Sequence, residues 1–233
     1  MSKGYLDLKQ SIAQAITNGE YAPHDQLPSQ RTLGQQFGLS HMSVRRAINE
    51  LIQEGLIYAV AGKGLYAAAP KVDVERDGMV SFSEDMRSRG MAASSRILRA
   101  EVVSAPTLLA QVLGVEIGAA LVYLRRLRLA NDEPMAVQDT YLPRALCPDL
   151  LEQIGQSPSL FALLREVYHL RLARSSNAAE AVLATDEEAR LLGMTLPAAL
   201  LITEQITYLD NGQPVEFVRS AYRGDRYRLT VKR

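Results

Sequence analysis

The feature that most constrains this fold is a three-residue connection, Gly38-Leu39-Ser40, between two helical patterns. The first pattern begins after the N-cap residue type Ser29 and turns Leu33 and Phe37 inward. The second begins after Ser40, also an N-cap residue type, and runs to Gly55. A glycine-containing turn this short is typical of the helix-turn-helix arrangement, in which two helices cross.

The flanking segments complete a winged helix. An earlier helix is predicted by apolar residues spaced three or four apart, and it ends at Asn18-Gly19; these residues are Tyr5, Leu8, Ile12 and Ile16. After Gly55, two short apolar runs surround a glycine-rich turn at 61–64 and predict a β-hairpin. Residues 1–69 are therefore predicted to form a winged helix-turn-helix domain.

A second domain is predicted over residues 79–233, after a polar linker at 70–78 without helical periodicity. Residues 113–121 resemble residues 192–200 at an offset of 79, and each copy contains a Leu-Gly turn followed by strands. This internal repeat predicts one antiparallel sheet with approximate two-fold symmetry. We expect an α+β domain whose helices, at 107–113, 159–168 and 185–192, cover one face of the sheet.

Composition narrows the function classes. Lysine plus arginine equals aspartate plus glutamate, 26 each, so the net charge is zero and attraction to nucleic acid must come from a local patch. The one cysteine, Cys147, excludes an internal disulfide framework and a CxxC metal site, and it is expected to be buried. No metal and no cofactor are predicted. The N-terminus lacks a signal-peptide pattern and no apolar run would span a membrane, so we expect a cytoplasmic protein without a membrane partner.

The helix after Ser40 has the pattern of a DNA recognition helix. Its outward arc holds Arg45, Arg46, Asn49 and Gln53, whereas the acidic residues lie toward its C-terminal end. A recognition helix places its N-terminal part in the major groove, where arginine binds guanine with two hydrogen bonds. The alternative from pattern alone is an ordinary solvated helix face.

The first domain resembles the GntR winged-helix regulators over about residues 5–69. The resemblance rests on Leu27-Pro28-Ser29-Gln30-Arg31, Phe37-Gly38-Leu39-Ser40, Ser43-Val44-Arg45-Arg46-Ala47, Leu51, Glu54-Gly55-Leu56 and Gly62-Lys63-Gly64. It implies that Arg31 and Arg45 contact the operator and that the wing glycines approach the minor groove. His41 stands where the family commonly has arginine, and His24 where it commonly has glycine. The candidate DNA-binding residues are Arg31, Ser40, His41, Ser43, Arg45, Arg46, Gly62, Lys63 and Gly64.

The second domain contains two arginines on one partly apolar strand face. Alternation along residues 121–130 places Arg126 and Arg128 on one side. Two such cations need an anionic partner, which is either a protein carboxylate, with Glu216 as the candidate, or a phosphate or carboxylate of a ligand. Upstream, Ser81 and Glu84 have the spacing of a capping box at a helix start.

This region resembles the UTRA effector-binding domain, which has a chorismate-lyase-like fold and follows the winged helix in the HutC subfamily. The resemblance covers about residues 78–230 and rests on residues 81–86, Arg89-Gly90, residues 124–129, Pro134, Leu142-Pro143, Ser159-Leu160, Leu192-Gly193, residues 214–216 and residues 222–227. In sugar-phosphate-responsive members, the phosphate is surrounded by the positions that match Phe82, Ser83, Arg126, Arg128 and Ser159, and the sugar end is held by those that match Glu216 and Tyr222. Gln138 replaces an acid and Phe161 a tyrosine of those members. The candidate effector-binding residues are Phe82, Ser83, Arg126, Arg128, Gln138, Ser159, Phe161, Glu216 and Tyr222.

Three classes of function follow. The favoured one is a ligand-responsive transcriptional regulator, usually a repressor in this family, acting as a homodimer paired through residues 78–233 on a palindromic double-stranded DNA operator. Its effector would be a small anionic metabolite such as a phosphorylated sugar or an organic acid. A chorismate-lyase-like enzyme domain fused to a DNA-binding module is the alternative, but the sequence supplies no nucleophile–base pair or metal cluster. A DNA-architectural protein is disfavoured by the neutral charge.

Overall fold

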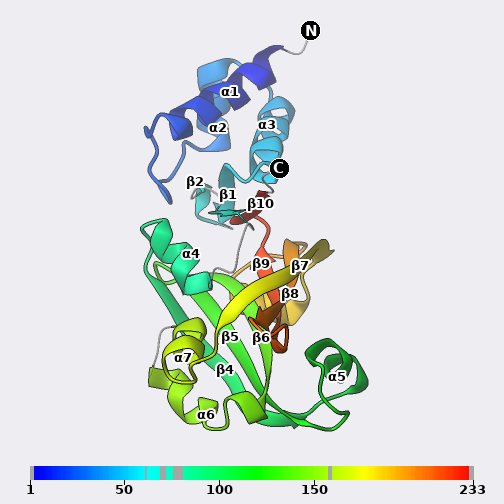
Figure 1. Cartoon of the computed structure of the whole chain (residues 1–233). Coiled ribbons are helices and arrows are strands. Elements are labelled where there is room, and N and C mark those ends of the chain that lie inside the picture. The colour runs from blue at the N-terminus through cyan, green and yellow to red at the C-terminus, as the bar shows by residue number, and fades with distance from the viewer. Residues whose placement is uncertain (1–2, 61, 69–71, 76–80, 157–158, 231–233) are drawn as a thin grey trace. The chain divides into compact units, whose positions relative to one another are not determined.

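The computed structural model describes residues 3–60, 62–68, 72–75, 81–156 and 159–230. Two compact units make up the chain, Met1–Val72 and Asp73–Arg233, and Figure 1 shows their elements. The division falls within the stretch that the sequence predicts as a linker.

The first unit has the elements expected of a winged helix. They are α1 (Lys3–Thr17), α2 (Gln30–Phe37), α3 (His41–Gln53), β1 (Ile57–Val60) and β2 (Gly64–Ala67). Ser29 and Ser40 are the N-caps of α2 and α3, and each side chain accepts a backbone N–H three residues later. Gly38 ends α2 in the left-handed region, at φ 62°, which allows the short turn into α3.

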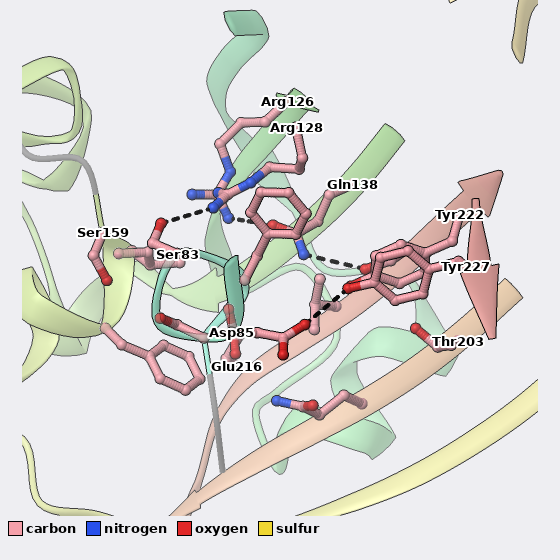
Figure 2. A pocket seen from close by; sticks show the side chains of 17 residues that line it. Ser83, Asp85, Arg126, Arg128, Gln138, Ser159, Thr203, Glu216, Tyr222 and Tyr227 are labelled. Carbon is pink, nitrogen blue, oxygen red and sulfur yellow. Dashed lines mark hydrogen bonds between the residues drawn. The ribbon is translucent and has the colours of Figure 1, made fainter. Parts of the chain in front are cut away.

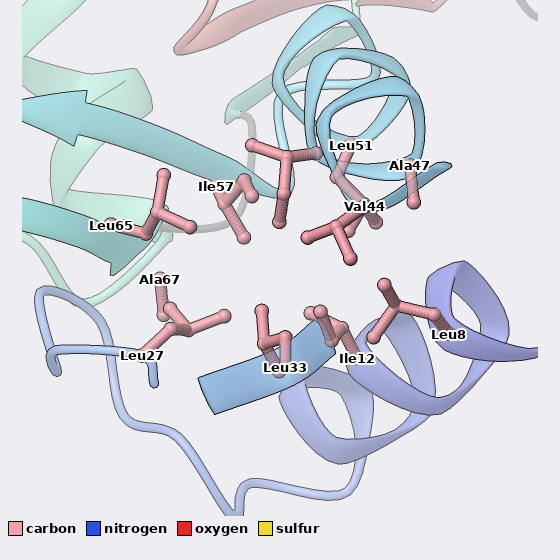
Figure 3. Close-up of a cluster of buried hydrophobic side chains, with 11 residues drawn as sticks. Leu8, Ile12, Leu27, Leu33, Val44, Ala47, Leu51, Ile57, Leu65 and Ala67 are labelled. Atoms are coloured by element: carbon pink, nitrogen blue, oxygen red, sulfur yellow. The ribbon is translucent and has the colours of Figure 1, made fainter. Parts of the chain in front are cut away.

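The core of this unit lies where the three helices meet the hairpin (Figure 3). It consists of Leu8, Ile12, Leu27, Leu33, Val44, Ala47, Ile48, Leu51, Ile57, Leu65 and Ala67. One predicted inward residue is wrong: Phe37, the last residue of α2, is 36% exposed.

The second unit is built on a six-stranded antiparallel sheet in the order β4-β5-β6-β9-β8-β7. The strands are β3 (Val72–Glu75), β4 (Ala93–Ser104), β5 (Ala120–Ala130), β6 (Glu133–Pro143), β7 (Leu172–Leu183), β8 (Ala199–Leu209), β9 (Pro214–Arg223) and β10 (Tyr227–Thr230). The helices are α4 (Phe82–Ser88), α5 (Thr107–Leu113), α6 (Leu150–Gln153), α7 (Leu160–Glu166) and α8 (Asp186–Leu192), with 3₁₀ turns at Arg144–Leu146 and Ile154–Gln156.

This strand order confirms the internal repeat. Each copy contributes three consecutive strands, and the copies meet where β6 pairs with β9. The repeated Leu-Gly turns end α5 and α8 in the same way, with Gly114 and Gly193 at φ 62° and 66°. The two halves are thus related by an approximate two-fold axis between β6 and β9.

The expectation that the helices cover one face is wrong. Leu192 of α8 joins the cluster of Leu127 and Val137 on one face, and α5 packs against Leu121 on that same face. Leu160 and its neighbours in α7 instead pack on Val122 and Leu124, which point to the opposite face. Strand periodicity shows which residues share a face, but it does not show which helix covers them.

The predicted linker also needs correction. Residues 72–75 form β3, which pairs with β10 in a separate two-stranded sheet. The residues 70, 71 and 76–78 lie outside the described residues. Four residues carry too little periodicity to identify a strand, and the partner strand is remote in sequence.

Candidate functional site

The outward face of α3 has its acidic residues neutralised. Lys9 of α1 lies 3.1 Å from the Glu50 carboxylate and also pairs with Glu54. Arg46 pairs with Glu50 at 3.2 Å and stacks over the Tyr5 ring at 4.2 Å. Hydrogen bonds from Lys9 and Arg46 lower the pKa of Glu50. Negative charge is therefore compensated at the C-terminal end of α3, away from its first turn.

Two arginines of α3 differ in their surroundings. Arg45 is exposed and makes no hydrogen bond or ion pair with any residue in the described ranges. Arg46 is held by Glu50 and Tyr5, although its side chain remains 61% exposed. Arg45 is thus the better candidate for base contact, and Arg46 is placed to bind a phosphate only if it leaves or shares these partners.

The remaining candidates for DNA contact lie on α2 and the wing. Arg31 is exposed in the first turn of α2, and His41 begins α3. In the wing, Gly62 and Gly64 have φ 72° and 121°, so a side chain at either position would be strained. Lys63 between them is exposed, and its carbonyl accepts a 2.8 Å hydrogen bond from Gln26.

The second unit contains a cavity, partly open to solvent, on one face of the sheet (Figure 2). All nine predicted effector-binding residues line it: Phe82, Ser83, Arg126, Arg128, Gln138, Ser159, Phe161, Glu216 and Tyr222. The structure therefore brings together residues from α4, β5, β6, α7 and β9 that are up to 140 positions apart.

The two arginines of β5 form one wall of the cavity. Arg126 donates to the Gln138 side-chain oxygen at 2.7 Å and to Thr140 at 3.3 Å. Arg128 donates to the Ser83 hydroxyl at 3.1 Å and lies 4.6 Å from the Phe82 ring centre. Both side chains are nearly buried, and the Nε atom of each has no hydrogen-bond partner among the described residues.

These arginines lack a carboxylate partner within 4.0 Å in the described part of the chain. Burial lowers the pKa of Arg126 to about 10 and, with the added repulsion of Arg126, the pKa of Arg128 to about 9. Glu216, the predicted internal partner, instead accepts a 2.9 Å hydrogen bond from Thr207. Burial raises the pKa of Glu216, so its charged form is disfavoured. Of the two alternatives, the protein salt bridge is not formed.

The rest of the cavity lining is uncharged except for Glu216 and Asp85. Gln138 donates to the Ser220 hydroxyl at 3.1 Å, which links the arginine strand to β9. Tyr222 and Tyr227 stack with ring centres 4.0 Å apart, and Tyr227 donates to Asp85 of α4 at 3.1 Å. The cavity thus combines two buried cations with hydroxyl, amide, carboxyl and aromatic groups.

Eight lining residues were not predicted as effector ligands: Ser81, Asp85, Leu160, Thr203, Gln205, Val218, Ser220 and Tyr227. Alternation along β9 could have found Val218 and Ser220, because they lie on the face of Glu216 and Tyr222. No sequence signal could have found Thr203, which reaches the cavity because it pairs with Ser220 across β8 and β9.

One other prediction, the burial of Cys147, can be compared with the structure. Cys147 is fully buried, as expected, and burial raises the pKa of its thiol to about 12. Across the described ranges, no cluster of His, Cys, Asp and Glu could hold a metal ion. No helix of the described chain has the length and apolar character needed to cross a membrane.

Comparison with known proteins agrees with both units. Residues 4–66 match the model of bacterial regulatory proteins of the gntR family, and residues 88–228 match the UTRA domain. The chain is 37% identical to the HTH-type transcriptional repressor NagR of Bacillus subtilis, over 96% of this chain and 91% of the relative. It is 31% identical to a histidine utilization repressor of Klebsiella aerogenes, over 97% and 92%. The crystal structure of PhnF from Mycobacterium smegmatis superposes with a TM-score of 0.69 at 26% identity, covering 97% of this chain and 98% of PhnF.

A winged helix followed by an α+β domain with a partly open cavity, together with these relatives, defines a ligand-responsive, DNA-binding transcriptional regulator. The chain belongs to the GntR family, in its UTRA-containing HutC subfamily. The relatives and solved structures are regulators, and none supports the alternative of a chorismate-lyase-like enzyme.

Proposed function

We propose that this regulator is a cytoplasmic repressor that binds a palindromic operator as a homodimer and leaves it when a small anionic metabolite occupies the UTRA cavity. The observation that supports the anion is the pair of buried arginines, Arg126 and Arg128, without a carboxylate partner in the described chain. Repression is supported by the relatives, several of which are named repressors.

On the DNA side, the first turn of α3 enters the major groove with His41, Ser43 and Arg45. Ser40 caps this helix, so its backbone N–H groups and its position are fixed. Arg31 and Arg46 contact the backbone or base edges on either side, and the wing residues Gly62, Lys63 and Gly64 approach the minor groove. The exposed cations and the compensated acids of α3 provide the local positive surface that a neutral chain requires.

A homodimer supplies the second half-site. The outer strands β4 and β7 of the sheet have mostly exposed side chains on both faces. Among these are apolar residues, with Val102 42% and Leu183 72% exposed. Such surfaces favour pairing of two UTRA domains, and two winged helices then read two half-sites of one operator.

On the effector side, an anionic group lies between Arg126, Arg128, Ser83 and Ser159. A phosphate or carboxylate there supplies the missing partner for both guanidinium groups and for their unsatisfied Nε atoms. The remainder of the ligand contacts Gln138, Phe161, Glu216 and Tyr222. Because Gln138 is neutral and Phe161 lacks a hydroxyl, we expect a less polar head than that of a sugar phosphate, and an organic acid is an alternative.

The signal leaves the cavity through α4, which follows the linker, and through β10, which pairs with β3 inside the linker. Ser81 and Glu84 cap the start of α4, which contributes Phe82 and Ser83 to the cavity. Tyr227 lines the cavity and begins β10, which pairs with β3. An anion that orders both elements changes the path of the chain toward the winged helix. The anion changes the free energy of operator binding by the difference in its own binding free energy between the DNA-competent and DNA-incompetent arrangements, typically about 1–3 kcal/mol.

The test begins with thermal unfolding of the full chain in the presence of inorganic phosphate, glucose 6-phosphate, citrate and glutamate, with chloride at equal ionic strength as the control. A compound that raises the melting temperature by specific binding is then added to the protein–operator complex. We expect dissociation of the complex from wild-type protein. The Arg126→Ala, Arg128→Ala double variant should bind operator normally and resist release. Release of this folded variant by the same compound would show that the arginines are only structural.

A further inference from the structure

Met42 is the most exposed large apolar side chain in the described part of unit 1. It is 71% exposed, whereas the other exposed large apolar residues in the described part of unit 1, Leu6, Phe37 and Ile52, lie between 36% and 42%. A methionine this exposed contributes nothing to the core of the winged helix. Its side chain, at the second residue of α3, is therefore available for contact with a partner.

The position of Met42 on the helix is informative. Residues Val44, Ala47, Ile48 and Leu51 of α3 are buried on one side. With 3.6 residues per turn, Met42 shares the opposite side with residues three, four and seven positions later, which are Arg45, Arg46 and Asn49. Met42 thus lies in the first turn and near the middle of the face that we place in the major groove.

The chemistry of the groove supplies a partner for such a side chain. Among the base edges exposed in the major groove, only thymine presents an apolar group, its C5-methyl. Methionine is unbranched, flexible and polarizable, so it adapts to a small apolar target. We infer that Met42 contacts the methyl group of a thymine in each half-site and makes the protein prefer thymine over cytosine there.

This inference rests on the proposed insertion of α3 into the major groove, and it adds a specificity that hydrogen bonds do not supply. His41 and Arg45 recognise donors and acceptors of base edges. Neither recognises a methyl group. The first turn of α3 then combines polar and apolar recognition of base edges.

The experiment removes single methyl groups from the DNA. An operator is first selected from random duplexes by the wild-type homodimer, and each thymine of its half-sites is replaced in turn by deoxyuridine. This exchange keeps base pairing and removes only the methyl group. By the free energy of burying one methyl group, we expect one position to weaken binding about fourfold per half-site, and about 15-fold when both half-sites are changed.

Variants assign the effect to Met42. Met42→Ala should bind the unmodified operator more weakly and lose all sensitivity to deoxyuridine at that position, whereas Met42→Leu should keep most of it. Ile52→Ala, at the other end of α3, is the matched control and should respond as wild type does. Equal sensitivity of wild type and Met42→Ala, or no sensitive thymine at all, overturns the inference.

A failure here is distinguishable from a failure of the proposed DNA surface. If α3 lies in the groove but Met42 does not contact thymine, Arg45→Ala still loses operator affinity and base preference. Wild type and Met42→Ala then respond equally to replacement of thymine by deoxyuridine. If α3 lies elsewhere, both substitutions leave binding unchanged. Circular dichroism of Met42→Leu and Met42→Ala confirms that the exposed substitutions leave the helices intact.

Discussion

Replacing Arg128 by methionine should stabilise the ligand-free protein. The Arg128 guanidinium is 3% exposed, lies beside a second buried cation and has no carboxylate within 4.0 Å among the described residues. Methionine has a similar length and no charge, so it fills the space without leaving an unpaired ion. Buried ionic groups are often replaced by apolar residues with a gain in stability.

The magnitude follows from the pKa. A decrease from 12.5 to about 9 corresponds to about 5 kcal/mol of cost for keeping the cation buried, at 1.36 kcal/mol per unit. Against this, methionine loses the hydrogen bond to Ser83, worth about 1.5–3 kcal/mol for a charged donor, and part of the contact with Phe82. The net expectation is a gain of about 1–3 kcal/mol, or roughly 3–10 °C in the melting temperature for a chain of this size.

The pH dependence of this gain has a definite sign. Above pH 9 the folded wild type releases the Arg128 proton that the unfolded chain still holds, so wild-type stability rises relative to the variant. The advantage of Arg128→Met should therefore be complete at pH 7 and shrink by about 2 kcal/mol between pH 7.5 and 10.5. Other titrating groups are common to both proteins and cancel in the difference.

The assay is urea unfolding of the full chain, followed by fluorescence and circular dichroism at several pH values. Arg190→Met, at an exposed position on α8, is the matched control and should change stability by less than about 0.5 kcal/mol. Adding inorganic phosphate should stabilise wild type and the control more than Arg128→Met. A variant that is less stable than wild type by more than about 1 kcal/mol would refute the reasoning, because it would mean that the charge is compensated inside the fold.

Further substitutions test the winged helix and the core. Arg45→Ala should cost about 1–3 kcal/mol of operator binding free energy and relax the base preference at one position per half-site, as measured by fluorescence anisotropy. An unchanged preference would show that α3 is not the recognition helix. Lys63→Ala should weaken binding to all duplexes alike and lower the slope of log affinity against log salt concentration by about 1. A loss confined to the operator would instead show that Lys63 contacts a base. His24 has φ 73° and bonds to Tyr58 at 3.0 Å, so His24→Ala should be less stable in urea than His24→Gly by about 1 kcal/mol, and the reverse order would exclude left-handed strain. Cys147, buried and with its thiol pKa raised to about 12, should react with a disulfide reagent at pH 8 only after unfolding; rapid native reaction would contradict its burial.

The sequence by itself determined the elements that depend on neighbouring residues. Ser29, Ser40 and Gly38 set the ends of α2 and α3, because caps and left-handed turns act within a few positions. The repeat predicted one sheet of two related halves, and strand alternation put Arg126 and Arg128 on one face. The choice of ligands around them came from the family resemblance, and their role in effector binding stays a prediction.

Only the tertiary structure decided which groups meet. The register of β6, β9 and β8 places Gln138 opposite Ser220 and Ser220 opposite Thr203, and no local pattern encodes that alignment. The same packing directs Glu216 to Thr207 and leaves the arginines without a carboxylate. Whether two buried charges pair depends on a few ångströms between strands that are remote in the chain. Local sequence preferences determine to which face of a strand or helix a side chain points. The distances between side chains on different strands follow from the packing of all the elements together.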